Sequence, residues 1–81
     1  MNEPSHLKLA IINRGKVIVV DEPVPNHPFA IAEVASGCAL LHNSSRRAVH
    51  FQLRHPDDGR VVMVMEHGAK TFHAAQGYRH G

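Results

Sequence analysis

The chain has 81 residues, of which 43% are hydrophobic and only 5% aromatic, and its formal net charge is +2. One domain is expected at this length, and it would bury only about 60% of the surface that its unfolded chain exposes. The single cysteine, Cys38, excludes an intramolecular disulfide, so a metal ion or a partner would have to support a thin core. Arg46-Arg47 is the densest basic cluster, which argues against nucleic-acid binding.

The N-terminal residues carry no basic leader ahead of an apolar run, which argues against a secretory signal. No stretch approaches the roughly 20 apolar residues of a membrane span. We therefore expect a cytoplasmic protein or a virion component that makes no contact with membranes. Residues 1–81 are expected to form a single β-domain, with residues 76–81 as a flexible tail.

A β-hairpin is predicted at the start of the chain, where two apolar segments flank Asn13-Arg14-Gly15 as a three-residue loop. Side chains alternate between the two faces of a strand. The predicted core face of this hairpin holds Leu7, Leu9, Ile11, Val17 and Val19. The opposite face mixes polar and apolar residues, namely Lys8, Ala10, Ile12, Lys16, Ile18 and Val20.

A second hairpin is predicted around Pro56-Asp57-Asp58-Gly59, in which proline begins the turn and glycine takes the left-handed position. We expect Arg54 to pair with Val61. The core face then holds Val49, Phe51, Leu53, Val62 and Val64. The mixed face holds His50, Gln52, Arg54, Val61, Met63 and Met65.

The fold class depends on residues 29–35, which are compatible with a strand or with a helix. As a strand, and with short strands at 38–42 and 70–74, this segment gives about seven strands and an all-β antiparallel sandwich or barrel, which we favour. As a helix over about residues 28–36, with Pro28 in the first turn and Gly37 after the end, it gives an α+β fold. The Pro-rich segment 21–28 connects this region to the first hairpin.

The mixed faces carry more apolar side chains than a sandwich turns inward, and contiguous exposed apolar patches mark interaction sites. Fully burying a Val, Ile or Met contributes roughly 1.5–3 kcal/mol. We expect a protein partner, either a second copy or a larger assembly, and no cofactor or small-molecule substrate. The alternatives are that these are ordinary surface residues of strands, or that a helix from Phe29 covers one sheet. The predicted interface comprises Ile12, Ile18, Val20, His50, Gln52, Arg54, Val61, Met63 and Met65.

Eight histidines suggest a metal site as an alternative, although the spacings HExxH, CxxC and HxH are absent. His42, His50 and His73 could converge from neighbouring strands. Cys38 is predicted to be a buried apolar residue rather than a nucleophile, and we predict no catalytic residue. The protein would then be a non-catalytic assembly protein. A histidine-based metal-binding protein and a small protein that inhibits or regulates an enzyme are the alternatives.

The segment NSSRRAVHFQLRHPDDGRVVMVMEHGAKTF, residues 43–72, resembles the second half of small immunoglobulin-like or fibronectin-III-like β-sandwich modules. Its order is a polar turn, an alternating strand, a Pro-Asp-Gly turn, a second strand, and a glycine before a closing strand. Such modules occur as virion proteins of tailed phages, which decorate capsids or join tail parts. The resemblance implies a binding scaffold without an active site. The chain departs from antibody-type domains because it has one cysteine and no tryptophan.

Overall fold

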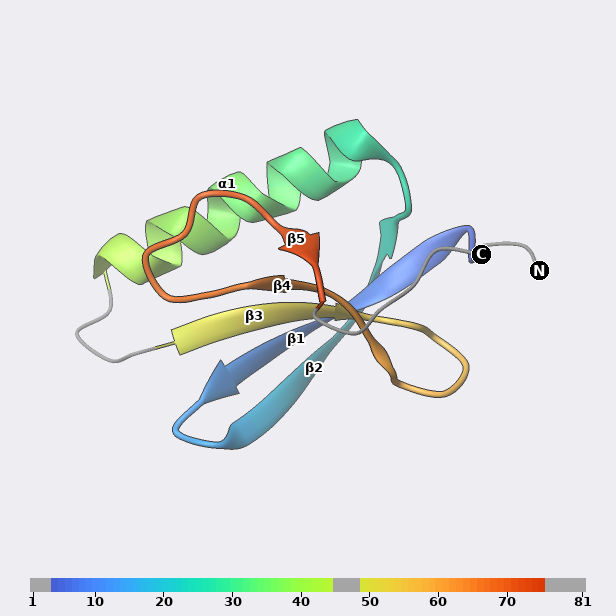
Figure 1. Cartoon of the computed structure of the whole chain (residues 1–81), viewed down its shortest axis with the longest axis horizontal. Helices are drawn as coiled ribbons and strands as arrows, with labels where there is room; N and C mark the ends of the chain where they lie inside the picture. Colours follow the sequence, from blue (N-terminus) through green and yellow to red (C-terminus); the bar gives the residue numbers. More distant parts are fainter. Residues whose placement is uncertain (1–3, 45–48, 76–81) are drawn as a thin grey trace.

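The computed structural model describes residues 4–44 and 49–75, which form one antiparallel sheet and one helix (Figure 1). The strands follow the order β2-β1-β3-β4-β5 across the sheet. The elements are β1 (His6–Asn13), β2 (Lys16–Pro25), α1 (Pro28–Ser44), β3 (Val49–Arg54), β4 (Val61–Met65) and β5 (His73–Ala74). The predicted tail, residues 76–81, lies outside the described residues.

The fold is the α+β alternative rather than a seven-stranded sandwich or barrel, because the described chain has five strands and the segment from Pro28 is helical. The prediction of strands at 29–35 and 38–42 was therefore wrong. α1 lies along one side of the sheet, and the segment between β4 and β5 passes beside it (Figure 1). In the described part of the chain, no helix is long and apolar enough to span a membrane.

The sequence at 27–38 explains why this segment is a helix. Pro28 occupies the first helical position, where its missing N–H costs nothing. The ring Nδ1 of His27 accepts a hydrogen bond from the backbone N–H of Phe29 at 3.2 Å, which satisfies one of the free amides of the first turn. Ile31, Ala35 and Cys38 recur at helical spacing and pack into the core against the sheet.

The first hairpin turns in two residues instead of the predicted three. Arg14 and Gly15 both have positive φ angles, 53° and 79°, as a type I′ turn requires, and Asn13 pairs with Lys16. Val17 therefore lies opposite Ile12 and Val19 opposite Ala10. The prediction that Val17 and Val19 belong to the core was wrong, because the shorter loop moves them to the other face of the sheet.

The second hairpin forms at the predicted turn, with Gly59 at a φ of 76° and Arg54 opposite Val61. The side chain of Asp58 accepts the backbone N–H of Arg60 at 3.0 Å, and this hydrogen bond holds the pKa of its carboxyl below the usual value. Beyond Arg54 the register shifts, so that Leu53 lies opposite Met63. One extra residue, Val62, is thereby accommodated in β4 as a β-bulge.

The bulge reverses the predicted faces of the rest of β4. Phe51 lies opposite Met65, and both side chains are fully buried. Gln52 lies opposite Val64 on the other face. The predictions that Met63 and Met65 point away from the core, and that Val64 points into it, were therefore wrong. The hydrophobic core lies between the sheet and α1 and comprises Leu7, Val24, Ala35, Cys38, Val49, Phe51, Leu53, Val62, Met65 and Phe72.

Two glycines provide a matched test of this backbone. A Cβ at either Gly15 or Gly37 would meet no atom within 4 Å, so only the backbone conformation distinguishes them. Gly15→Ala should lower the free energy of unfolding by about 1 kcal/mol, because an alanine is strained at positive φ. Gly37→Ala should raise it by about 0.5–1 kcal/mol, because Gly37 lies inside α1. Urea denaturation measures both changes in the free energy of unfolding. Equal changes for the two substitutions would contradict the positive φ of Gly15 in the β1–β2 turn.

Candidate protein-binding surface

The sheet has one face packed against α1 and a second face, here called the open face, that no described segment covers. Cross-strand partners share a face, so the registers define its members. It comprises His6, Lys8, Ala10, Ile12, Val17, Val19, Pro23, Pro25, His50, Gln52, Arg54, Val61, Val64 and His73.

The centre of the open face is apolar and its surroundings are polar. Ala10 and Ile12, in the middle of β1, are buried by their neighbours although they lie outside the core cluster. Gln52 and Arg54 are half-buried beside them. Both Nε and a terminal nitrogen of Arg54 donate to Oε1 of Gln52, at 3.0 and 2.8 Å, which fixes these two side chains. An apolar centre with a polar rim is the usual anatomy of a protein interface.

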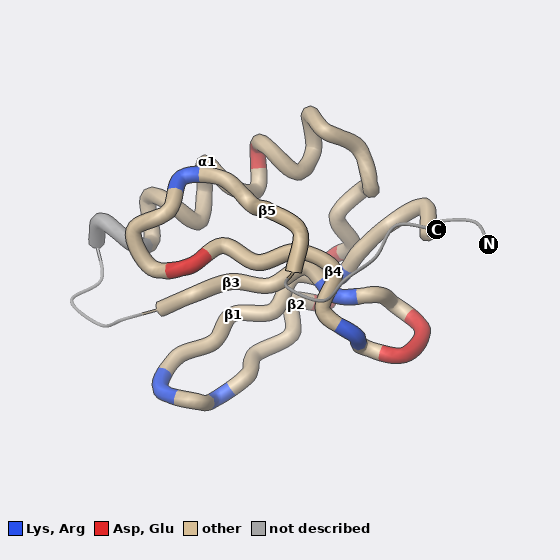
Figure 2. The backbone as a smooth tube through the Cα atoms, viewed as in Figure 1, with Lys and Arg blue, Asp and Glu red and all other residues tan. Residues whose placement is uncertain are grey.

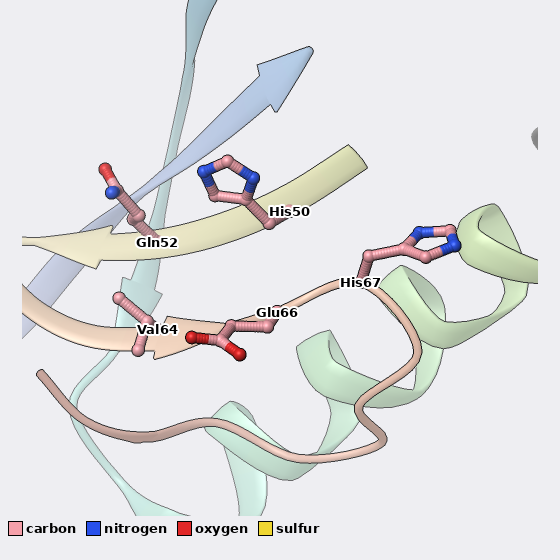
Figure 3. Close-up of a pocket in the computed structure, with 5 residues that line it drawn as sticks. All are labelled: His50, Gln52, Val64, Glu66 and His67. Atoms are coloured by element: carbon pink, nitrogen blue, oxygen red, sulfur yellow. The ribbon is translucent and has the colours of Figure 1, made fainter. Parts of the chain in front are cut away.

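One end of the open face is hollowed. The hollow has a volume of about 510 Å³ and is lined by His50, Gln52, Val64, Glu66 and His67. Figure 3 shows the side chains of His50 and Gln52 on β3, with those of Val64 and Glu66 beside them on β4 and directly after it. The ring of His67 points away from these side chains. The lining of the hollow thus combines one aliphatic side chain with four hydrogen-bonding ones.

A strip of three exposed apolar residues borders the open face on β2. Val17, Ile18 and Val19, here called the edge strip, expose 47%, 56% and 45% of their surface. Val17 and Val19 belong to the open face, and Ile18 lies on the other side of the sheet, opposite Ile11. Ile18 stays exposed because the β1–β2 turn extends away from α1 (Figure 1).

The outer side of α1 is a second exposed apolar surface, which the sequence interpretation missed. Phe29, Leu40 and Leu41 are all exposed, and the ring of Phe29 stacks on that of His27 at 5.5 Å. The available signal was the composition of the helix, in which Glu33 is the one residue among 17 that is Asp, Glu, Lys or Arg. A helix that is apolar on all sides normally has neighbours on all sides.

The structure brings together five of the nine predicted interface residues. Ile12, His50, Gln52, Arg54 and Val61 all lie on the open face. Ile18 is exposed on the opposite side of β2, and Val20 is half-buried where the β1–β2 register shifts. Met63 and Met65 lie on the α1 side, as the β4 bulge dictates.

The predicted alternative of a histidine metal site stays a prediction, because one of its three residues lies outside the described side chains. Among the described side chains of residues 4–41 and 49–75, no three His, Cys, Asp or Glu lie close enough to hold a metal ion. His50 lies on β3 and His73 on β5, with β4 between them. The side chain of His42, the third predicted ligand, is not among those described.

No protein-family model, curated protein or solved structure matches the chain.

Cys38 should behave as a core residue rather than as a reactive thiol. Its side chain is 3% exposed, and burial raises its pKa from 9.0 to about 11. The thiol is therefore protonated at neutral pH, and it should react with a disulfide reagent far more slowly in the native protein than in denaturant. Because the folded pKa is raised, the protein should also lose stability as the pH rises from 9 towards 11. Fast labelling of the native protein at neutral pH would contradict this burial.

Proposed function

We propose that the protein is a non-catalytic assembly module that associates with copies of itself through the open face and the edge strip. The observation that carries the proposal is a sheet face that residues 4–44 and 49–75 leave uncovered, with a buried apolar centre, a polar rim and an adjoining strip of exposed valine and isoleucine. A domain of this size has a small hydrophobic core and is only marginally stable. Burial of this surface against a second copy therefore contributes a large share of the stability of the protein.

Several features support association with protein rather than with nucleic acid or membrane. Basic side chains are few on the open face, where Lys8 and Arg54 are its only lysine and arginine, and Arg54 is bound to Gln52. The exposed apolar residues of the edge strip are aliphatic and offer no aromatic platform on which bases could stack. A place in a phage virion is the most concrete form of this proposal, and it rests on the family resemblance alone.

The test compares two glutamate substitutions by sedimentation velocity over a range of protein concentrations. Val64→Glu places a carboxylate on the open face, and self-association should weaken about tenfold or more, because a buried valine contributes roughly 1.5–3 kcal/mol. Thr71→Glu is the control, since Thr71 is exposed on the segment between β4 and β5 and lies outside the open face and the edge strip. Equal weakening by both variants, or none by either, would contradict the proposed surface.

A further inference from the structure

The outer edge of β2 is the long unpaired edge of the described sheet. β2 spans ten residues and pairs only with β1, whereas β5, at the other edge, has two residues. An exposed edge strand presents free backbone N–H and C=O groups and is a template for pairing with another chain. The edge strip lies in the middle of this edge, and it carries neither a charge nor a proline.

The turn determines which backbone groups of β2 point outward. Asn13 and Lys16 flank the two-residue turn, so the backbone N–H and C=O of Lys16 point towards β1. Along an antiparallel strand these groups alternate in direction. Those of Val17 and Val19 therefore point away from β1, and those of Ile18 point towards it. Pro23 and Pro25 limit pairing at the far end of the strand, because proline has no N–H.

The charges along β2 select both the partner and its direction. Arg14 and Lys16 lie at one end of the edge strip, at the tip of the hairpin, and Asp21 and Glu22 lie at the other end (Figure 2). An antiparallel copy of the same strand places each basic end beside an acidic end. A parallel copy would place like charges together, which is unfavourable.

From these observations we infer that β2 pairs antiparallel with β2 of a second copy, with Ile18 facing Ile18 across a two-fold axis. Val17 of each copy then lies opposite Val19 of the other, and their outward backbone groups form four hydrogen bonds. This register keeps α1 of both copies on the same side and joins two five-stranded sheets into one. The inference rests on the proposed self-association and names one of its contacts, the one at the edge strip. The open faces of both copies lie together on the other side of the joined sheet, outside this contact.

Hydrogen exchange of the full-length protein tests this pairing directly. In a monomer, the outward amides of Val17 and Val19 exchange rapidly, whereas the inward amide of Ile18 is protected by β1. In the paired dimer, protection of Val17 and Val19 should rise with protein concentration and approach that of Ile18. Rapid exchange of both amides in a solution that sedimentation shows to be dimeric would overturn the inference.

Two sets of variants separate the edge from the open face. Val19→Pro removes one outward N–H from each copy without removing a bond to β1, so affinity should fall about tenfold or more while circular dichroism stays native. Arg14→Glu should also weaken the dimer, because Arg14 lies opposite Glu22 of the other copy in this register, and adding Glu22→Lys to it should restore affinity. Loss of association with Val64→Glu, but with none of these edge variants, would refute the edge pairing and leave the proposed function standing. A wild-type protein that stays monomeric would refute both.

Discussion

Replacing Met65 by glutamate is expected to unfold the protein. Met65 is fully buried opposite Phe51, between the sheet and α1. Truncating such a methionine costs about 2–5 kcal/mol, and an unpaired buried carboxylate adds several more. A domain of this length has a total stability of roughly 4–12 kcal/mol. Far-ultraviolet circular dichroism and thermal denaturation would show the loss of the cooperative transition.

Val64→Glu is the matched control for this substitution, because Val64 precedes Met65 on the same strand and lies on the open face opposite Gln52. Its half-exposed side chain leaves the carboxylate in contact with water, so the fold should persist. If Met65→Glu stayed folded while Val64→Glu unfolded, the β4 bulge would be misplaced, and the faces would be those predicted from strict alternation.

Phe51→Ala is expected to lower the free energy of unfolding by about 3–5 kcal/mol, the usual cost of truncating a core phenylalanine. Phe51 is fully buried in the middle of the core cluster, opposite Ile11 on one side and Met65 on the other. Chemical denaturation with urea measures the change directly, provided that the transition stays two-state.

The neighbouring residue supplies the comparison for Phe51. Gln52 is half-buried on the open face, where its side chain accepts two hydrogen bonds from Arg54. Gln52→Ala should therefore cost about 1 kcal/mol or less, since half-buried side-chain hydrogen bonds contribute modestly. A cost for Gln52→Ala that matched that of Phe51→Ala would mean that the open face is covered in solution before any association.

The parts of the fold that could be predicted from the sequence are those in which local signals agree. The Pro56–Gly59 turn and the alternation of Val49, Phe51 and Leu53 predict β3 and its core face, and the structure confirms both. Alternation then failed beyond Val62, because a bulge inserts one residue and reverses the faces after it. Five consecutive apolar residues in β4 suit either face, so no local pattern marks the bulge.

The first hairpin was placed correctly, but its loop length was not. Asn13-Arg14-Gly15 fits a three-residue loop with glycine at its end as well as a two-residue turn with Arg14 at positive φ. Arginine rarely adopts that conformation, so the residues favoured the longer loop. The one-residue difference moved Val17 and Val19 from the predicted core to the exposed edge strip.

The sequence favoured a strand at residues 29–35, and the alternative helix was predicted too short because Gly37 was interpreted as its end. Gly37 is exposed inside α1, which continues through residues 38–42 to Ser44. Tertiary packing overrides the low helix propensity of one glycine, because Ala35 and Cys38 on either side of it are held in the core. The same misinterpretation hid Leu40 and Leu41, which were assigned to a strand.

The candidate surface was predicted in part. Strand parity in β3 placed His50, Gln52 and Arg54 on a common face, and the structure confirms their grouping. The edge strip could not be identified, because the order of strands in a sheet depends on long-range pairing. Only that order, with β2 outermost, distinguishes an interior strand from an edge.

Sedimentation equilibrium of the unmodified full-length chain is the most direct test of the central claim, that one copy leaves apolar surface which a second copy covers. The account predicts a mass that rises from that of one 8.9 kDa chain to twice this value or more as the concentration increases. A mass that stays at 8.9 kDa up to the solubility limit, from a sample with native circular dichroism, would contradict it.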